Sequence, residues 1–170
     1  MDLRPARTAN AHFPGYNGGM TIQAKYVHTN LIARDWRKLA DFYIQVFGCQ
    51  PVPPERDFQG PVLESGTGIA GAHLTGAHLR LPGWGESGPT LELFNYNILS
   101  EQSKPQVNQP GFGHLAFQVE DVAAARAAVL RAGGGAVGEV VTLRIASGAA
   151  VTWCYVRDPE GNILELQSWG

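Results

Sequence analysis

The fold is decided by a stretch of sequence that occurs twice. Residues 27–48 read VHTNLIARDWRKLADFYIQVFG, and residues 113–134 read GHLAFQVEDVAAARAAVLRAGG. Three landmarks coincide when the two are aligned: His28 with His114, Asp35 with Asp121, and Gly48 with Gly134. Self-similarity of this kind indicates an internal duplication.

A second repeat lies near the end of each half. PTLELFNY, which begins at Pro89, matches NILELQSW, which begins at Asn162. Glu92 therefore falls on Glu165, and each glutamate stands between two leucines. The duplication thus covers whole structural units and not a single motif.

Each half predicts a strand, a helix and further strands. Alternating apolar and polar residues predict first strands over 24–32 and 112–119. Asp35 and Asp121 suit the N-caps of the helices that follow, and Gly48 suits the end of the first helix. Later strands are predicted over five ranges: 69–81, 89–96, 136–144, 149–157 and 162–169. The expected fold class is α+β, with two βαβββ modules forming a curved mixed sheet.

The expected organisation is one domain with an extension. Residues 1–22 lack periodicity and are interpreted as an N-terminal extension, and residues 23–170 as the domain. Within it, module 1 covers about 23–96 and module 2 about 112–170. The polar, proline-broken segment 97–111 is the predicted linker, and 50–68 is interpreted as a long loop.

Composition excludes several classes of function. Thirteen Lys and Arg against fifteen Asp and Glu leave a net charge of −2, with no basic run to follow a nucleic acid. No stretch approaches the roughly 20 apolar residues of a membrane helix. Cys49 and Cys154 stand far apart and are expected to be small buried residues in a reducing compartment. We therefore expect a cytoplasmic protein whose partner is a small molecule.

Four side chains suggest a metal site. The leucines around Glu92 and Glu165 are expected to face the helices, so both carboxylates point to the opposite face of the sheet. His114 also opposes the apolar face of its strand, and His28 is its counterpart. Two imidazoles and two carboxylates suit one divalent ion such as Ni²⁺, Zn²⁺, Co²⁺, Mn²⁺ or Fe²⁺. The curved sheet is therefore expected to enclose a metal cup.

Ordinary roles compete with this interpretation. A lone His or Glu on a strand is usually a polar surface residue, and only the joint recurrence of the four favours a metal. His73 and His78 are interpreted as ordinary polar positions and not as a fifth ligand. Arg80 and Arg157 are expected at solvated strand ends, with binding of a substrate carboxylate as the alternative.

The sequence resembles the vicinal oxygen chelate superfamily, which includes glyoxalase I, methylmalonyl-CoA epimerase, extradiol dioxygenases, and fosfomycin and bleomycin resistance proteins. The resemblance rests on VHTNLIARDWRKLADFYIQVFG, LELFNY, GHLAFQVEDV and DPEGNILEL and covers about residues 24–169. It implies a glyoxalase I type of metal set, supplied by four residues: His28, Glu92, His114 and Glu165. Dioxygenases and fosfomycin enzymes would leave Glu92 outside the set, the epimerase has Gln there, and bleomycin binders hold no metal.

The resemblance also implies a reaction. The metal would chelate neighbouring substrate oxygens and stabilise an enediolate, while Glu165, with Glu92 as its symmetric partner, would move a proton between carbons. The substrate suggested first is the hemithioacetal of methylglyoxal and glutathione, for a lyase or isomerase. Epimerisation, ring cleavage with oxygen, and metal-free binding remain alternatives. Because each half supplies one His and one Glu, we expect a homodimer whose sites each combine halves of two chains.

Overall fold

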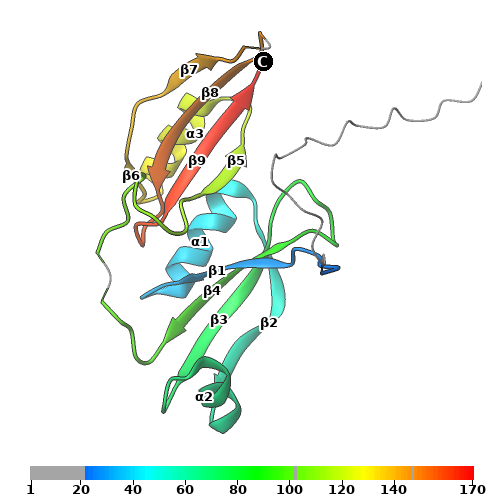
Figure 1. Ribbon diagram of the computed structural model, residues 1–170, viewed down its shortest axis with the longest axis vertical. Coiled ribbons are helices and arrows are strands. Elements are labelled where there is room, and N and C mark those ends of the chain that lie inside the picture. Colours follow the sequence, from blue (N-terminus) through cyan, green and yellow to red (C-terminus); the bar gives the residue numbers. More distant parts are fainter. Residues whose placement is uncertain (1–21, 102, 147) are drawn as a thin grey trace, which may run out of the picture.

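The computed structural model describes residues 22–101, 103–146 and 148–170. It has an α+β fold of two βαβββ-like modules (Figure 1). In chain order the elements are β1 (His28–Ile32), α1 (Trp36–Phe47), β2 (Gln50–Gln59), α2 (Pro61–Thr67), β3 (His73–Arg80), β4 (Thr90–Tyr96), β5 (Leu115–Gln118), α3 (Val122–Arg131), β6 (Gly135–Ala136), β7 (Val141–Arg144), β8 (Ala150–Arg157) and β9 (Ile163–Trp169).

The strands form two sheets and not the single curved sheet that was predicted. The first has the order β1-β4-β3-β2, and the second has the order β5-β9-β8-β6, with β7 also paired to β8. In each, the first strand pairs in parallel with the last strand of its module. The prediction of one sheet was wrong because each module closes its own ladder, and in the described residues no ladder joins β1 to β5.

Residues 50–68, expected to be a loop, contain β2 and α2. Strand β2 reads QPVPPERDFQ, and its three prolines disfavour an inner strand. In the structure β2 is an edge strand, the position in a sheet that tolerates proline, and its pairing with β3 shifts register between Val52 and Arg56. An edge position therefore explains how a proline-rich segment becomes a strand.

The predicted helix signals are confirmed. Asp35 accepts a hydrogen bond from the Lys38 amide at 3.0 Å, and Asp121 accepts one from the Ala124 amide at 2.9 Å. Gly48 ends α1 in the left-handed region with φ 69°, a conformation that glycine adopts without a Cβ penalty. Local capping therefore positions both helices directly after the first strand of each module.

The two modules share one hydrophobic core. It joins α1 and the buried faces of β1, β3 and β4 to α3 and the buried faces of β8 and β9. Phe47 of α1 stacks on Phe117 of β5 with a centroid distance of 4.0 Å. Both cysteines are free and buried as expected, and burial raises the pKa of Cys49 to about 11. The shared core makes the two modules a single packed unit.

A buried hydrogen bond also joins the modules, and its removal should lower stability. The Tyr43 hydroxyl on α1 donates to Asp158 of the second module at 2.9 Å, and both residues are buried. Tyr43→Phe should therefore lower the free energy of unfolding by about 1–2 kcal/mol in urea titrations. Tyr26→Phe is the matched control, because Tyr26 is exposed and should change stability by less than about 0.5 kcal/mol. Equal losses in the two variants would contradict a stabilising role for the Tyr43–Asp158 bond.

Two expectations concern the segments outside the modules, namely the N-terminal extension and the linker. The proposed extension falls on residues 1–22, and residues 1–21 lie outside the described residues. The described residues of the predicted linker 97–111 contain no helix or strand. Across the described parts of the chain, no helix is both long enough and apolar enough to span a membrane.

Candidate functional site

The first module brings His28 and Glu92 together. Strands β1 and β4 pair in parallel, with His28 opposite Thr90 and Asn30 opposite Glu92. His28 Nε2 lies 3.2 Å from Glu92 Oε2, and Asn30 Nδ2 donates to the same oxygen at 3.3 Å. The imidazole and the carboxylate therefore face each other directly.

The second module repeats this pair. Strands β5 and β9 pair in parallel, with Ala116 opposite Glu165, and His114 directly precedes β5. His114 Nε2 lies 2.8 Å from Glu165 Oε2. The duplication therefore preserves the arrangement of the side chains as well as the residue types.

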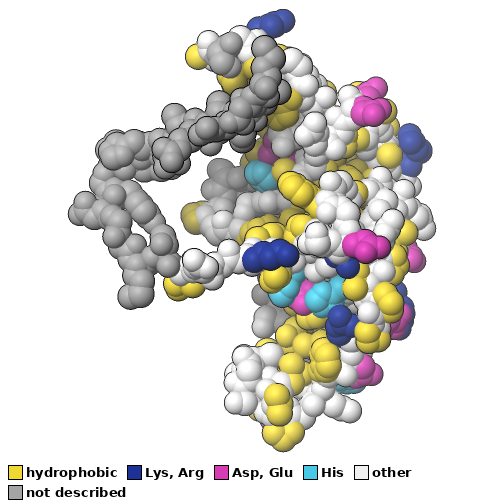
Figure 2. All heavy atoms as spheres, turned by 90° about the vertical axis from the view of Figure 1, so that its right-hand side faces the viewer, with side chains coloured by type: hydrophobic (Ala, Val, Ile, Leu, Met, Phe, Trp, Pro, Cys, Tyr) yellow, Lys and Arg dark blue, Asp and Glu magenta, His cyan; other side chains and the backbone are white. Residues whose placement is uncertain are grey.

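Both pairs lie on the sheet faces that the helices leave uncovered. The residues that alternate with the glutamates are fully buried: Leu91, Leu93, Leu164 and Leu166. The alternation of a strand then places Glu92 and Glu165 on the opposite face. Figure 2 views the molecule from the right-hand side of Figure 1 and shows histidine side chains on this surface, two of them flanking an acidic side chain at the height of β1.

The structure does not unite the two pairs within one chain. Each pair belongs to its own sheet. In the part of the chain that the structure describes, no group of three or more His, Cys, Asp or Glu side chains is arranged to hold a metal ion. The predicted metal cup is therefore not shown by the single chain. Each module supplies only half of the proposed donor set.

A third histidine, His78, joins the first pair, and sequence reasoning missed it. His78 lies opposite Glu92 in the antiparallel ladder of β3 and β4, and its Nε2 is 2.8 Å from Glu92 Oε1. Burial lowers the pKa of His78, and the charge of Glu92 opposes that shift. The alternation of His78 with the buried Ala77 and Leu79 was the available signal.

The other polar candidates have local partners. His73 Nε2 lies 2.7 Å from Asp57 Oδ1, and Arg80 donates to the Gly88 carbonyl at 3.1 Å. Arg157 was expected at a solvated strand end, but it is buried. It donates to the carbonyls of Gly161 and Pro105, at 2.7 and 2.6 Å. Arg157 therefore ties the linker to the last turn, a contact that strand periodicity does not encode.

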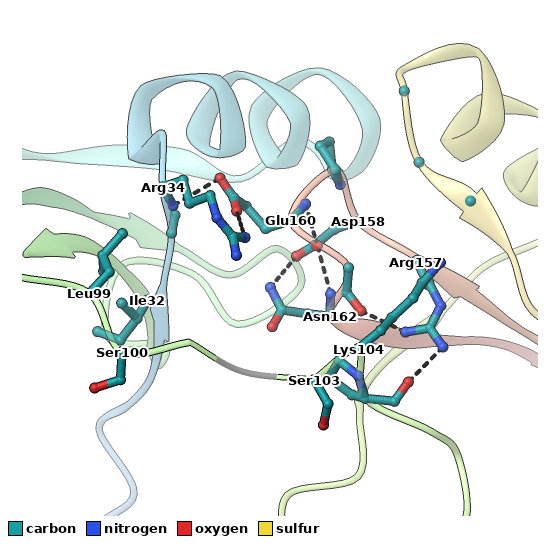
Figure 3. A pocket seen from close by; sticks show the side chains of 17 residues that line it. Ile32, Arg34, Leu99, Ser100, Ser103, Lys104, Arg157, Asp158, Glu160 and Asn162 are labelled. Atoms are coloured by element: carbon teal, nitrogen blue, oxygen red, sulfur yellow. Dashed lines mark hydrogen bonds and ion pairs between the residues drawn. The ribbon is translucent and has the colours of Figure 1, made fainter.

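A cavity of about 480 Å³ lies between the modules (Figure 3). Its walls come from the end of β1, the linker around Lys104, and the turn from Arg157 to Asn162. None of the four predicted ligands lines it. The predicted site and this cavity are therefore separate features of the molecule.

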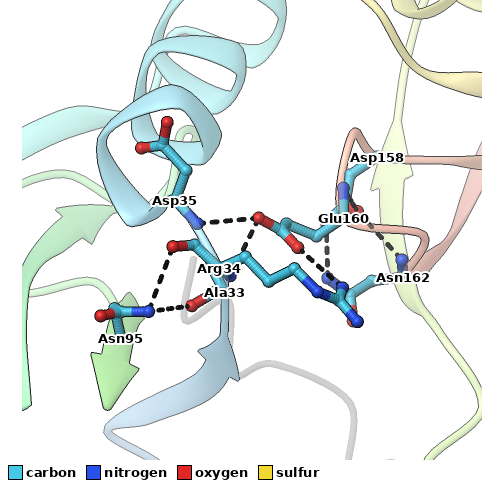
Figure 4. Close-up of polar contacts among 7 residues, drawn as sticks. All are labelled: Ala33, Arg34, Asp35, Asn95, Asp158, Glu160 and Asn162. Carbon is cyan, nitrogen blue, oxygen red and sulfur yellow. Dashed lines mark hydrogen bonds and ion pairs between the residues drawn. The ribbon is translucent and has the colours of Figure 1, made fainter. Parts of the chain in front are cut away.

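The polar groups at this cavity hold the modules together (Figure 4). Glu160 accepts hydrogen bonds from the Arg34 and Asp35 amides, each at 3.0 Å, at the start of α1. Asp158 accepts bonds from the backbone and the side chain of Asn162, at 2.9 and 2.8 Å. Burial raises the pKa of Asp158, and its hydrogen bonds act in the opposite direction. The charged side chains at this cavity therefore have a structural role, which is to join the two modules.

The open face of the second sheet is aromatic. Trp153 and Tyr155 alternate with buried residues of β8, and their ring centroids lie 5.0 Å apart. The His114 ring lies 5.1 Å from that of Tyr155, and Trp169 is exposed on β9. Burial and the charge of Glu165 raise the pKa of Tyr155, so its phenol keeps its proton at neutral pH. Apolar surface and a hydroxyl group thus adjoin the second His–Glu pair.

Comparisons with known proteins agree with this architecture. Solved structures with similar folds include a glyoxalase family protein from Bacillus cereus, with 19% identity, coverage of 89% of this chain and 97% of that chain, and a TM-score of 0.68. A glyoxylase/bleomycin resistance protein/dioxygenase domain from Frankia sp. EAN1pec has 18% identity, coverage of 86% and 98%, and a TM-score of 0.56. A glyoxalase family protein from Enterococcus faecalis has 20% identity, coverage of 85% and 96%, and a TM-score of 0.52. At these identities the likeness shows the fold alone.

Sequence comparison is informative at the level of the family. No curated protein matches the chain. Residues 25–166, which include most of both modules and all four predicted ligands, match the family described as the Glyoxalase/Bleomycin resistance protein/Dioxygenase superfamily. The chain therefore belongs to the glyoxalase/bleomycin resistance protein/dioxygenase superfamily.

Proposed function

We propose that the protein is a metal-dependent lyase or isomerase of the glyoxalase I type. The observation that carries this proposal is the repeated His–Glu pair, with nitrogen to oxygen distances of 3.2 Å in the first module and 2.8 Å in the second. The proposed metal ligands are the four residues of these pairs: His28, Glu92, His114 and Glu165.

The position of Glu92 favours this activity over ring cleavage. A dioxygenase-type set of His28, His114 and Glu165 would leave Glu92 without a role at the metal. In the structure Glu92 faces His28 much as Glu165 faces His114. The equivalence of the two carboxylates supports a set of four ligands.

The donor set fits a divalent ion of intermediate softness. Each pair contributes an imidazole nitrogen and a carboxylate oxygen, and each Nε2 atom faces the carboxylate. Such donors suit Ni²⁺, Zn²⁺, Co²⁺, Mn²⁺ or Fe²⁺. When bound, the ion would supply positive charge that stabilises negative charge developing on neighbouring substrate oxygens.

A homodimer completes the site in this proposal. Because one chain places its two pairs on separate sheets, the open face of module 1 in one protomer would meet the open face of module 2 in its partner. Exposed apolar side chains on these faces support the contact: Ile32 and Phe58 on the first sheet, and Val141, Leu143 and Trp169 on the second.

Glu165 is the proposed base. It would take a proton from a substrate carbon and return it to the neighbouring carbon, so the reaction is an isomerisation with no net oxidation. A carboxylate must be able to move to do this. Among the described residues, Glu165 has one side-chain contact of this kind, to His114, whereas Glu92 is held by His28, Asn30 and His78. The looser carboxylate suits proton transfer, and the more firmly held one suits a fixed ligand.

The proposed substrate is the hemithioacetal of methylglyoxal and glutathione. The direct test is isomerisation of this compound by protein stripped of metal and reconstituted with Ni²⁺, Zn²⁺, Co²⁺, Mn²⁺ or Fe²⁺ in turn. Turnover that depends on added metal supports the proposal. Metal-dependent oxygen uptake with catechols, without isomerisation, would replace it by a dioxygenase.

Metal content gives a prediction that does not need the substrate. His114→Ala removes one of four ligands from an open sheet face, so most bound metal should be lost while the fold persists. Elemental analysis after dialysis, with circular dichroism for the fold, measures both. His73→Ala is the matched control, because His73 pairs with Asp57 away from the site and should leave the metal content unchanged. Stoichiometric metal in folded His114→Ala would show that the site is misplaced.

The aromatic face of the second sheet favours one other candidate. Trp153, Tyr155 and Trp169 could hold a flat organic molecule without any metal, as a bleomycin-resistance type of binder would require. Wild-type protein that stays free of metal after reconstitution, yet binds such compounds, would favour this second function.

A further inference from the structure

The two carboxylates of the proposed site differ in how they are held. Internal duplication makes β3 and β8 equivalent, so the residue opposite Glu92 can be compared with the residue opposite Glu165. His78 lies opposite Glu92, and Tyr155 lies opposite Glu165. The two modules therefore differ at the position opposite the candidate ligand, which is a histidine in the first module and a tyrosine in the second.

Hydrogen bonding determines which ring nitrogen of His78 carries the proton. A carboxylate only accepts hydrogen bonds, so the contact of 2.8 Å between His78 Nε2 and Glu92 Oε1 requires the proton of a neutral imidazole to sit on Nε2. His78 Nδ1 is then an acceptor, and the Thr90 hydroxyl, 3.3 Å away, can donate to it. Thr90, His78 and Glu92 thus form a directed chain that ends on the carboxylate.

Nothing equivalent holds Glu165. Within the described residues, the Tyr155 hydroxyl makes no hydrogen bond to Glu165, and the side-chain contact of Glu165 is the one to His114. Glu92, in contrast, has both oxygens engaged, one by His78 and the other by His28 and Asn30. Glu92 is also mostly shielded, with 12% of its side chain exposed.

We propose that His78 is a positioning residue that fixes Glu92 as a permanent ligand and so confines proton transfer to Glu165. This inference rests on the proposed metal-dependent function. Residues that hold a ligating carboxylate affect a metal site without touching the metal, and their loss commonly weakens metal binding or activity by 10- to 100-fold.

The test compares metal affinity in four proteins by competition with a chromogenic chelator, using Zn²⁺ as the probe. His78→Leu should weaken Zn²⁺ binding by about 10- to 100-fold. His78→Gln should recover most of the loss, because its amide N–H can also donate to Glu92. His73→Leu is the control on the same strand and should stay within about twofold of wild type, because His73 contacts Asp57.

A second set of variants, made in protein that lacks the Glu92 side chain, isolates the contribution of the His78–Glu92 contact. In Glu92→Ala protein, His78→Leu should change Zn²⁺ affinity by less than about threefold, because the side chain that His78 holds is already absent. The imidazole ¹⁵N spectrum of metal-free wild type should report the Nε2–H form of His78.

The failures are distinguishable. Wild-type affinity in folded His78→Leu, or an Nδ1–H form of His78, would overturn the positioning role while the metal site itself stands. Wild-type protein that binds no Zn²⁺ would overturn the proposed function, and the positioning role with it.

Discussion

Replacing Glu165 by Gln is expected to lower turnover by about 100- to 10,000-fold while leaving most of the bound metal in place. An amide oxygen can still coordinate a metal, but an amide cannot accept a proton near neutral pH. Gln has nearly the volume of Glu, and Glu165 is mostly shielded with 18% of its side chain exposed, so the packing of β9 should persist. The measurement is kcat together with metal content by elemental analysis.

Glu92→Gln is the matched variant, because the two glutamates occupy equivalent positions of the duplication. If Glu92 is the fixed ligand, its replacement should act mainly on metal affinity, and kcat at saturating metal should fall much less than in Glu165→Gln. A loss of kcat confined to Glu92→Gln would reverse the assignment of the base. Full activity in both variants would remove proton transfer by these carboxylates from the mechanism.

The features predicted well are those encoded by neighbouring residues. Capping by Asp35 and Asp121 and the glycine that ends α1 depend on a few adjacent positions, and they were confirmed. The facing of Glu92 and Glu165 away from the core follows from strict alternation with buried leucines. The duplication predicted one His and one Glu at equivalent positions of each module, and in the structure the two side chains of each module are in contact.

The features predicted poorly depend on which strands become neighbours. His78 contacts Glu92 only through the register of β3 with β4, and that register is a property of two segments separated by a turn. The prolines of β2 disfavour a strand unless the strand lies at an edge, which is decided by the whole sheet. Arg157 is buried because the linker crosses it at Pro105. Pairing and packing of distant segments are not visible in local periodicity.

The relative placement of the two modules is another feature that local sequence patterns do not predict. It rests on contacts such as the stacking of Phe47 on Phe117 and the bond from Tyr43 to Asp158. Sequence repetition predicts two similar units, but it does not predict whether their open faces meet within one chain. This question decides how a complete site is assembled.

If each site combines residues of two chains, a mixture of two inactive proteins should regain activity. One variant carries His28→Ala with Glu92→Ala, which destroys the half-site of module 1. The other carries His114→Ala with Glu165→Ala, which destroys the half-site of module 2. Each alone should be inactive, because every site it can form lacks two of four ligands.

Mixed dimers behave differently if each site combines module 1 of one chain with module 2 of its partner. One site of the mixed dimer then receives both damaged halves, and the other receives both intact halves. Random pairing after joint unfolding and refolding should therefore return about one quarter of the wild-type activity.

The controls make the result decisive. Different affinity tags on the two variants allow mixed dimers to be isolated, and each variant refolded alone shows whether refolding itself creates activity. Sites built within single chains would stay inactive in every combination. Isolated mixed dimers without activity would therefore refute a site shared between chains. Activity confined to the mixed fraction would require a site with ligands from two chains.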